Sequence, residues 1–108
     1  MQMTTRNLVQ EVTAMMLKGK TTGHGIKMFD AVEGVLDAYN KAIAKHPDET
    51  WPKDVVHMTA IMMEEAGEAV QAANDVAHAN ASLEPLRLEL VQTAAMCIRC
   101  LVNLEDRA

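Results

Sequence analysis

Three glutamates stand close together in an otherwise apolar stretch of the chain: Glu64, Glu65 and Glu68. If this stretch is helical, residues three and four apart share one side, so the carboxylates can point the same way. Such a cluster is more often a solvent-exposed stripe, because Glu is seldom buried. The alternative is that the carboxylates hold a cation. Gly67 favours this alternative, since a glycine inside a helix costs about 1 kcal/mol relative to Ala and suits the close approach of another helix or a ligand.

A second polar stripe occurs near the C-terminus at steps of three and four residues. It is either the solvent side of a helix or a surface that faces the first three acids across a cleft. Hard cations such as Mg²⁺ bind oxygen ligands, usually a few carboxylates together with substrate phosphates. Two facing helices that carry acids can supply those carboxylates. The stripe consists of Glu89, Gln92, Met96, Arg99 and Asn103.

Two motifs in these stretches resemble the EExxE…ExxD signature of the all-α, MazG-like nucleoside triphosphate pyrophosphohydrolases. The similarity covers about residues 51–104, and residues 1–50 match only as generic helices. The residues that carry it are Glu64-Glu65-Ala66-Gly67-Glu68 and Glu89-Leu90-Val91-Gln92, with Trp51-Pro52-x-Asp54-x-x-His57 before them and Gln92-Thr93-Ala94-Ala95-Met96 and Arg99 after them.

This resemblance implies an enzyme that uses Mg²⁺, with Mn²⁺ as a possible substitute, to hydrolyse a nucleoside triphosphate to the monophosphate and pyrophosphate, including modified or damaged nucleotides. It also implies a pocket near a subunit contact that a partner chain helps to complete. The site residues that it suggests are Glu64, Glu65 and Glu68 as catalytic residues and Glu65, Glu68, Glu89 and Gln92 as metal ligands. From their residue types and positions, we expect Arg99, Lys53 and Asn103 to contact the substrate. Gln92 stands where the family has Asp.

The elements that would position these residues are all helical by their apolar spacing. Helices are expected over residues 5–18, from about Lys27 to Lys45, from Pro52 in a first turn to about Ala79, and from an N-cap at Ser82 to about Glu105, with a glycine-rich loop over residues 19–25. No segment alternates as a strand would. The predicted fold is therefore all-α, a single domain over residues 1–108 forming a four-helix bundle of two short and two long helices.

Composition limits the partners. The chain has 108 residues, a net charge of −5 and only three aromatic residues, and its Lys and Arg are scattered, so nucleic acid is not an expected partner. No apolar run reaches the roughly 18 to 20 residues of a membrane span, and we expect a cytoplasmic protein. Its small-residue core predicts oligomerisation, and with the family resemblance we expect a homodimer or homotetramer. Cys97 and Cys100 are expected to stay reduced.

Two other functions remain open at this stage. The first is a catalytically weakened MazG-like module for nucleotide sensing or dimerisation, which Gln92 suggests because its amide is neutral where the family has a carboxylate. The second is a helical interaction protein without a ligand, which would follow if the glutamate stripe is solvated. A P-loop at Gly19-Lys20-Thr21 is disfavoured because Ala14 replaces its first glycine.

Overall fold

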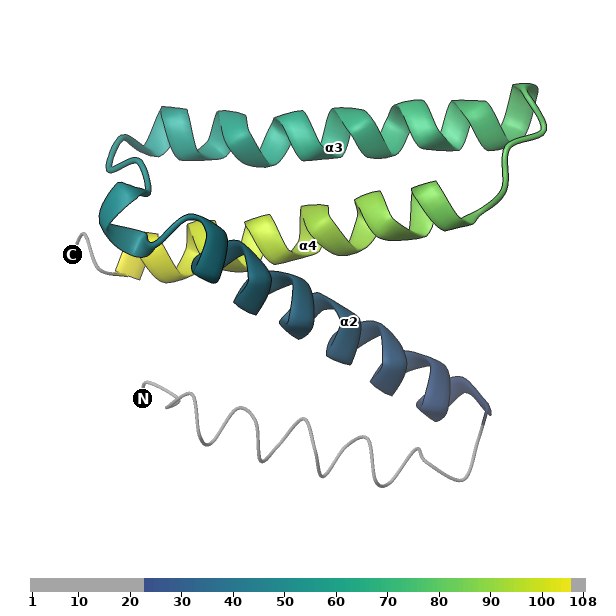
Figure 1. Cartoon of the computed structure of the whole chain (residues 1–108), viewed down its shortest axis with the longest axis horizontal. Coiled ribbons are helices and arrows are strands. Elements are labelled where there is room, and N and C mark those ends of the chain that lie inside the picture. The colour runs from purple at the N-terminus through teal and green to yellow at the C-terminus, as the bar shows by residue number, and fades with distance from the viewer. Residues whose placement is uncertain (1–22, 106–108) are drawn as a thin grey trace. The chain divides into compact units, whose positions relative to one another are not determined.

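The computed structural model describes residues 23–105 of the protein, and within that range every regular element is helical. Figure 1 shows the three α-helices, labelled α2, α3 and α4, with no strand among the described residues. The predicted all-α class is confirmed for this range. The predicted helix over residues 5–18 lies outside the described residues, so the four-helix count stays a prediction, as does the oligomer. None of the described helices is both long and apolar enough to cross a membrane.

The chain divides into two units between Glu33 and Gly34, a point inside helix α2. The single domain predicted over residues 1–108 stays a prediction. The second unit, from Gly34 onward, contains the end of α2 together with α3 and α4. All the residues proposed for a functional site therefore lie in this unit.

Helix α2 runs over Gly23–Lys45. Its end agrees with the prediction, because Pro47 disfavours a helical conformation at His46. Its start does not: the loop was expected to continue to Gly25, whereas the helix already includes Gly23 and Gly25. The first N–H groups of a helix have no partner within it, so glycines in the first turn weaken it less than glycines in the interior. With 23 residues α2 is as long as the other two helices, and the expectation that it is short is wrong.

Helix α3 covers Val55–His78 and follows a 3₁₀ turn, η1, over Asp48–Thr50. The Asp54 carboxylate caps its N-terminus by accepting hydrogen bonds from the N–H groups of Val56 at 2.7 Å and His57 at 3.1 Å. The prediction that Pro52 lies in the first turn is wrong, because this cap starts the helix three residues later. The helix ends one residue before the predicted limit.

Helix α4 covers Glu84–Glu105. Pro85 lies in its first turn, as predicted. Ser82 is not the N-cap, because the N–H of Arg87 donates to the carbonyl of Leu83 at 2.9 Å and the residue that accepts the first helical bond is the cap. The start of α4 is therefore one residue later than the Ser82 cap implied.

Helices α3 and α4 pack side by side in opposite directions (Figure 1). The buried apolar side chains of these two helices are small or flexible: Met58, Ala69 and Ala72 from α3 and Ala95 from α4. Small side chains let two helix backbones approach closely. Consequently, polar side chains at the edge of this contact on one helix can reach those on the other, which is the arrangement that the candidate site needs.

Candidate metal centre

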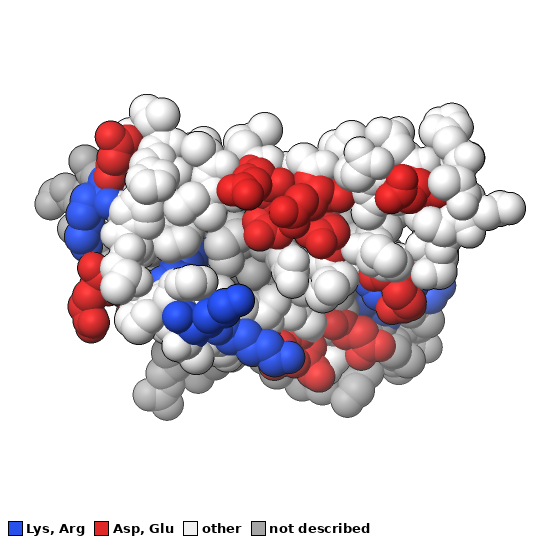
Figure 2. Space-filling model, turned by 45° about the horizontal axis from the view of Figure 1, so that its top comes forward, with Lys and Arg blue, Asp and Glu red and all other residues white. Residues whose placement is uncertain are grey.

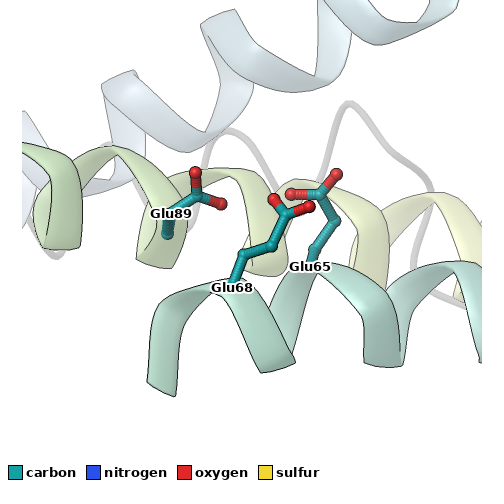
Figure 3. Close-up of side chains that lie close together, drawn as sticks. All are labelled: Glu65, Glu68 and Glu89. Atoms are coloured by element: carbon teal, nitrogen blue, oxygen red, sulfur yellow. The ribbon is translucent and has the colours of Figure 1, made fainter. Parts of the chain in front are cut away.

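The carboxylates of Glu65 and Glu68 on α3 meet that of Glu89 on α4 (Figure 3). One carboxylate oxygen from each residue lies within 4.8 Å of one from each of the others. Glu65 and Glu68 are three residues apart and share a side of α3, and the antiparallel packing places Glu89 opposite them. We call these three residues the acid cluster. The predicted facing of the two polar stripes is thus observed for their acids.

Burial in the acid cluster is uneven. Glu65 and Glu89 are half-buried, whereas Glu68 is exposed. The Oε2 atoms of Glu65 and Glu89 are shielded from solvent and accept no hydrogen bond from an N–H or O–H group of the described chain. Their near neighbours are other carboxylates, which can share a hydrogen bond only when one of them is protonated. A carboxylate whose shielded oxygen lacks a hydrogen-bond donor is costly to keep ionised.

The pKa values of the cluster reflect this environment. Burial is the main cause that raises the pKa of Glu65, followed by the negative charge of Glu68, while a hydrogen bond with Glu89 acts in the opposite direction. Burial is also the main cause that raises the pKa of Glu89, followed by the hydrogen bond and the charge of Glu68. Crowded, partly desolvated carboxylates hold protons more tightly, because the charged form is disfavoured.

Over residues 23–105, no cationic side chain forms an ion pair with the acid cluster. The ion pairs of the described residues join Arg87 to Glu84 and Arg99 to Asp48, and neither includes a cluster residue. On the face shown in Figure 2, acidic side chains gather in a patch that no Lys or Arg touches. A divalent cation would supply the missing positive charge, and carboxylate oxygens are the ligands that Mg²⁺, Mn²⁺ and Ca²⁺ accept. The residues present therefore fit a hard divalent cation.

Glu64, Gln92 and Lys53, which were also proposed for the site, are not among the three converging carboxylates. Glu64 is exposed on α3, and its charge contributes to raising the pKa of Glu65. Gln92 is half-buried on α4, one turn after Glu89. Lys53 is exposed in the segment that precedes α3. Their proposed roles stay predictions.

Arg99, expected to contact substrate, is 1% exposed and packs against the end of α2. Its Nη1 donates to the carbonyl of Ala42 at 3.1 Å, and its Nη2 donates to the carbonyl of His46. Nη2 also lies 3.3 Å from Oδ1 of Asp48, and the guanidinium carbon lies 4.3 Å from the centre of the Trp51 ring. These contacts give Arg99 a structural role, and its contact with a phosphate stays a prediction.

Asn103, the other proposed substrate contact on α4, is 7% exposed. Its Nδ2 donates to the backbone carbonyl of Arg99 at 2.8 Å, four residues earlier in the same helix. Such a bond within one helix positions the amide without involving a second element. A contact of Asn103 with substrate stays a prediction.

Two smaller expectations can be compared with the structure. A Cβ atom placed on Gly67 would meet no atom within 4 Å, so no other helix of the described chain comes close there, and the approach of a ligand or of a second chain stays a prediction. Cys97 and Cys100 are free thiols, as expected. The Cys100 Sγ lies 3.4 Å from the carbonyl of Met58, to which it donates, and burial raises the pKa of this thiol.

Comparison of the chain with known protein families, with curated proteins and with solved structures finds no match.

Proposed function

We propose that this protein is a Mg²⁺-dependent, MazG-like nucleoside triphosphate pyrophosphohydrolase, which converts a nucleoside triphosphate and water to the monophosphate and pyrophosphate. The observation that supports it is the acid cluster, Glu65, Glu68 and Glu89, whose carboxylates converge from two helices within 4.8 Å without a positive partner among the described residues. The EExxE motif and the Glu89-Leu90-Val91-Gln92 segment support the choice of family. Modified or damaged nucleotides are included among the proposed substrates.

In this proposal the acid cluster binds the cation, and the amide oxygen of Gln92 is available as a neutral ligand. Bound Mg²⁺ would polarise a phosphate and lower the pKa of a water molecule. A carboxylate beside the attacking water accepts its proton. Exposed Glu64, adjacent to the cluster in sequence, is the residue that we assign to this step or to orienting the water.

The charge of the site also explains why the proposed activity needs a metal. A nucleoside triphosphate is a polyanion, and three carboxylates without a positive partner repel it. A divalent cation offsets most of this negative charge and offers the phosphate oxygens a positive centre to bind, which lets the phosphates approach. Exposed Lys53 can add a positive charge at the start of α3. We therefore expect substrate binding and turnover to disappear together when divalent cations are removed.

Gln92 favours a second candidate, a weakened family member that binds nucleotide with little or no turnover. The family motif has a fourth carboxylate at this position, and a neutral amide lowers the negative charge that attracts the metal. Such a module would still bind Mg²⁺ and nucleotide through the same three acids. Ligand-induced stabilisation without pyrophosphate release would distinguish it from the enzyme.

The test is pyrophosphate release from a panel of standard and modified triphosphates, with Mg²⁺, with Mn²⁺ and with a chelator. The variants Glu65→Gln and Glu68→Gln should lose release, while Glu84→Gln, which changes an exposed acid on α4 away from the cluster, should keep it. Release that survives chelation, or no release by the wild type, would rule out the enzyme. Release gained by Gln92→Asp from an inactive wild type would support the weakened member.

A further inference from the structure

A pair of thiols lies on α4 outside the acid cluster. Cys97 and Cys100 are three residues apart on this helix, so they share one side of it, and their Cβ atoms are about 5 to 6 Å apart. Both residues are half-buried, and neither forms a disulfide. Burial, and then the neighbouring Cys97, raise the pKa of the Cys100 thiol. The two thiols are therefore close enough to interact, and their sulfur atoms can bind one ion together.

The thiol pair lies where α4 contacts α3. The Sγ of Cys100 donates to the carbonyl of Met58 on α3 at 3.4 Å, and this contact fixes which residues of the two antiparallel helices are level with each other. Met62 lies four residues after Met58, and Met96 lies four residues before Cys100. Residues four apart share a helix side, so the two methionines are level and on the sides that meet. Both are half-buried, and methionines of both helices therefore flank the thiol pair.

The chemistry of these side chains selects the kind of ion. Thiolate and thioether sulfur are soft ligands, which prefer soft ions such as Cu(I). A structural Zn²⁺ site needs four ligands from Cys, His or carboxylate residues. Among the residues that the structure describes, the acid cluster is the one group of three or more such residues whose ligand atoms converge, and it includes neither cysteine. The thiol pair therefore suits an ion that is satisfied by two or three sulfur ligands, and does not suit zinc.

We propose that Cys97 and Cys100 form a binding site for one soft monovalent cation of the Cu(I) class, with the thioethers of Met62 and Met96 available as further ligands. Binding breaks two S–H bonds, forms two metal–sulfur bonds and releases two protons. Neither the sulfur atoms nor the cation change oxidation state. Because the pKa of Cys100 is raised, its proton is replaced only by an ion that binds sulfur strongly.

The thiol pair and the acid cluster are separate sites on the same two helices. Cys97 follows Glu89 by eight residues, which is about 12 Å along α4. The acid cluster offers oxygen ligands, which hard cations such as Mg²⁺ prefer, whereas the thiol pair offers sulfur. Mg²⁺ and Cu(I) should therefore each bind to a different site, and the proposed soft-cation site does not depend on the proposed enzyme.

Competition for Cu(I) tests the proposal in the full chain under anaerobic, reducing conditions. A chromophoric Cu(I) chelator serves as the competitor, and its absorbance reports how much of the ion the protein takes. We expect the wild type to take one Cu(I) per chain. Cys97→Ser and Cys100→Ser should each weaken binding at least about a hundredfold, since the loss of an outer partner of a metal site already costs about 10 to 100-fold. The control Met63→Leu, which replaces an exposed methionine of α3, should bind like the wild type.

Failure of the wild type to take Cu(I) overturns the proposal. Binding that both cysteine variants retain also overturns it, because the ion would then be held by methionines alone. Zn²⁺ bound as tightly as Cu(I) would contradict the assignment to a soft, low-coordinate cation. Cys97→Ala and Cys100→Ala replace the serine variants if these do not fold, as monitored by circular dichroism. Glu65→Gln should leave Cu(I) binding unchanged, so a failure here is distinguishable from a failure of the proposed enzyme.

Discussion

Replacing Glu65 by Gln should stabilise the metal-free protein. The substitution keeps the shape of the side chain and removes one negative charge from a group whose oxygens lie within 4.8 Å of one another. At this distance two unit charges repel by about 1 kcal/mol in water and by about 3 kcal/mol at the dielectric constant typical of a protein surface. Glu65 is half-buried, and the shielded Oε2 of its carboxylate lacks a donor, so the gain should lie between these limits.

The assay is urea unfolding at low salt and about pH 8, where carboxylates are normally ionised, with a chelator present. We expect Glu65→Gln to raise the free energy of unfolding by about 1 to 3 kcal/mol. The control Glu84→Gln removes an exposed acid that pairs with Arg87 on the same helix, and such surface changes stay within about 0.5 kcal/mol. Adding Mg²⁺ should reverse the order, because binding to the folded wild type stabilises it by about 4.1 kcal/mol at a thousandfold excess over Kd.

The reasoning is refuted if metal-free Glu65→Gln is less stable than the wild type. That result would mean that the three carboxylates support one another through hydrogen bonds instead of repelling, and that a neutral proton-sharing cluster is the native state. A Mg²⁺-induced stabilisation equal in Glu65→Gln and the wild type would also contradict it, because the cation would then bind elsewhere.

The remaining predictions concern pH, the Arg99 contacts and Gln92. The pKa values of Glu65 and Glu89 are raised above 4.5 in the folded state, so the folded protein binds these protons more tightly than the unfolded chain does. The stability that the two protonated residues contribute is therefore present below pH 4.5 and is lost as pH rises through their folded-state pKa values. Urea unfolding of the wild type with a chelator present should show this loss. If the difference in unfolding free energy between the wild type and the double variant Glu65→Gln/Glu89→Gln does not change with pH, the prediction is contradicted. Arg99→Met should lower the free energy of unfolding by about 3 kcal/mol, since it leaves the carbonyls of Ala42 and His46 without their donor; an unchanged midpoint would show that the contacts carry little stability. Gln92→Asp should tighten Mg²⁺ binding in calorimetry about tenfold, and unchanged affinity would place residue 92 outside the metal site.

Much of the acid cluster was predictable because its geometry is local. Glu65 and Glu68 are on one helix, and their spacing alone places them on one side of it. Glu89 follows because α3 and α4 are joined by a short connection and therefore pack antiparallel, which brings residues on either side of the turn together. The same spacing could not decide which carboxylates would be shielded, since shielding depends on how closely the small residues of the contact let the helices approach.

The position of Arg99 could not be predicted from the sequence. Its acceptors, the carbonyls of Ala42 and His46, lie 57 and 53 residues earlier, and no local pattern connects such distant positions. A charged residue in a stripe of polar side chains is normally solvent-exposed, which is why it was assigned to a phosphate. The unpaired carbonyls at the end of a helix attract a buried cation, and this tertiary contact decided where the side chain lies.

The beginnings of the helices differed from the predictions for a related reason. Several residue types can serve as a cap, so the choice between neighbouring positions depends on which side chain actually reaches the free N–H groups. Asp54 does so for α3, and α4 starts after Leu83 although Ser82 is the better capping residue by type. The ends of α2 and α3 were closer to the predictions.

Calorimetric titration of the full chain with Mg²⁺ tests most directly the claim that the acid cluster is a cation site. We predict saturable binding by the wild type and by Glu84→Gln, and binding weakened at least about tenfold in Glu89→Gln, which removes the only acid that α4 contributes to the cluster. No binding by the wild type, or equal binding by all three proteins, would contradict the claim.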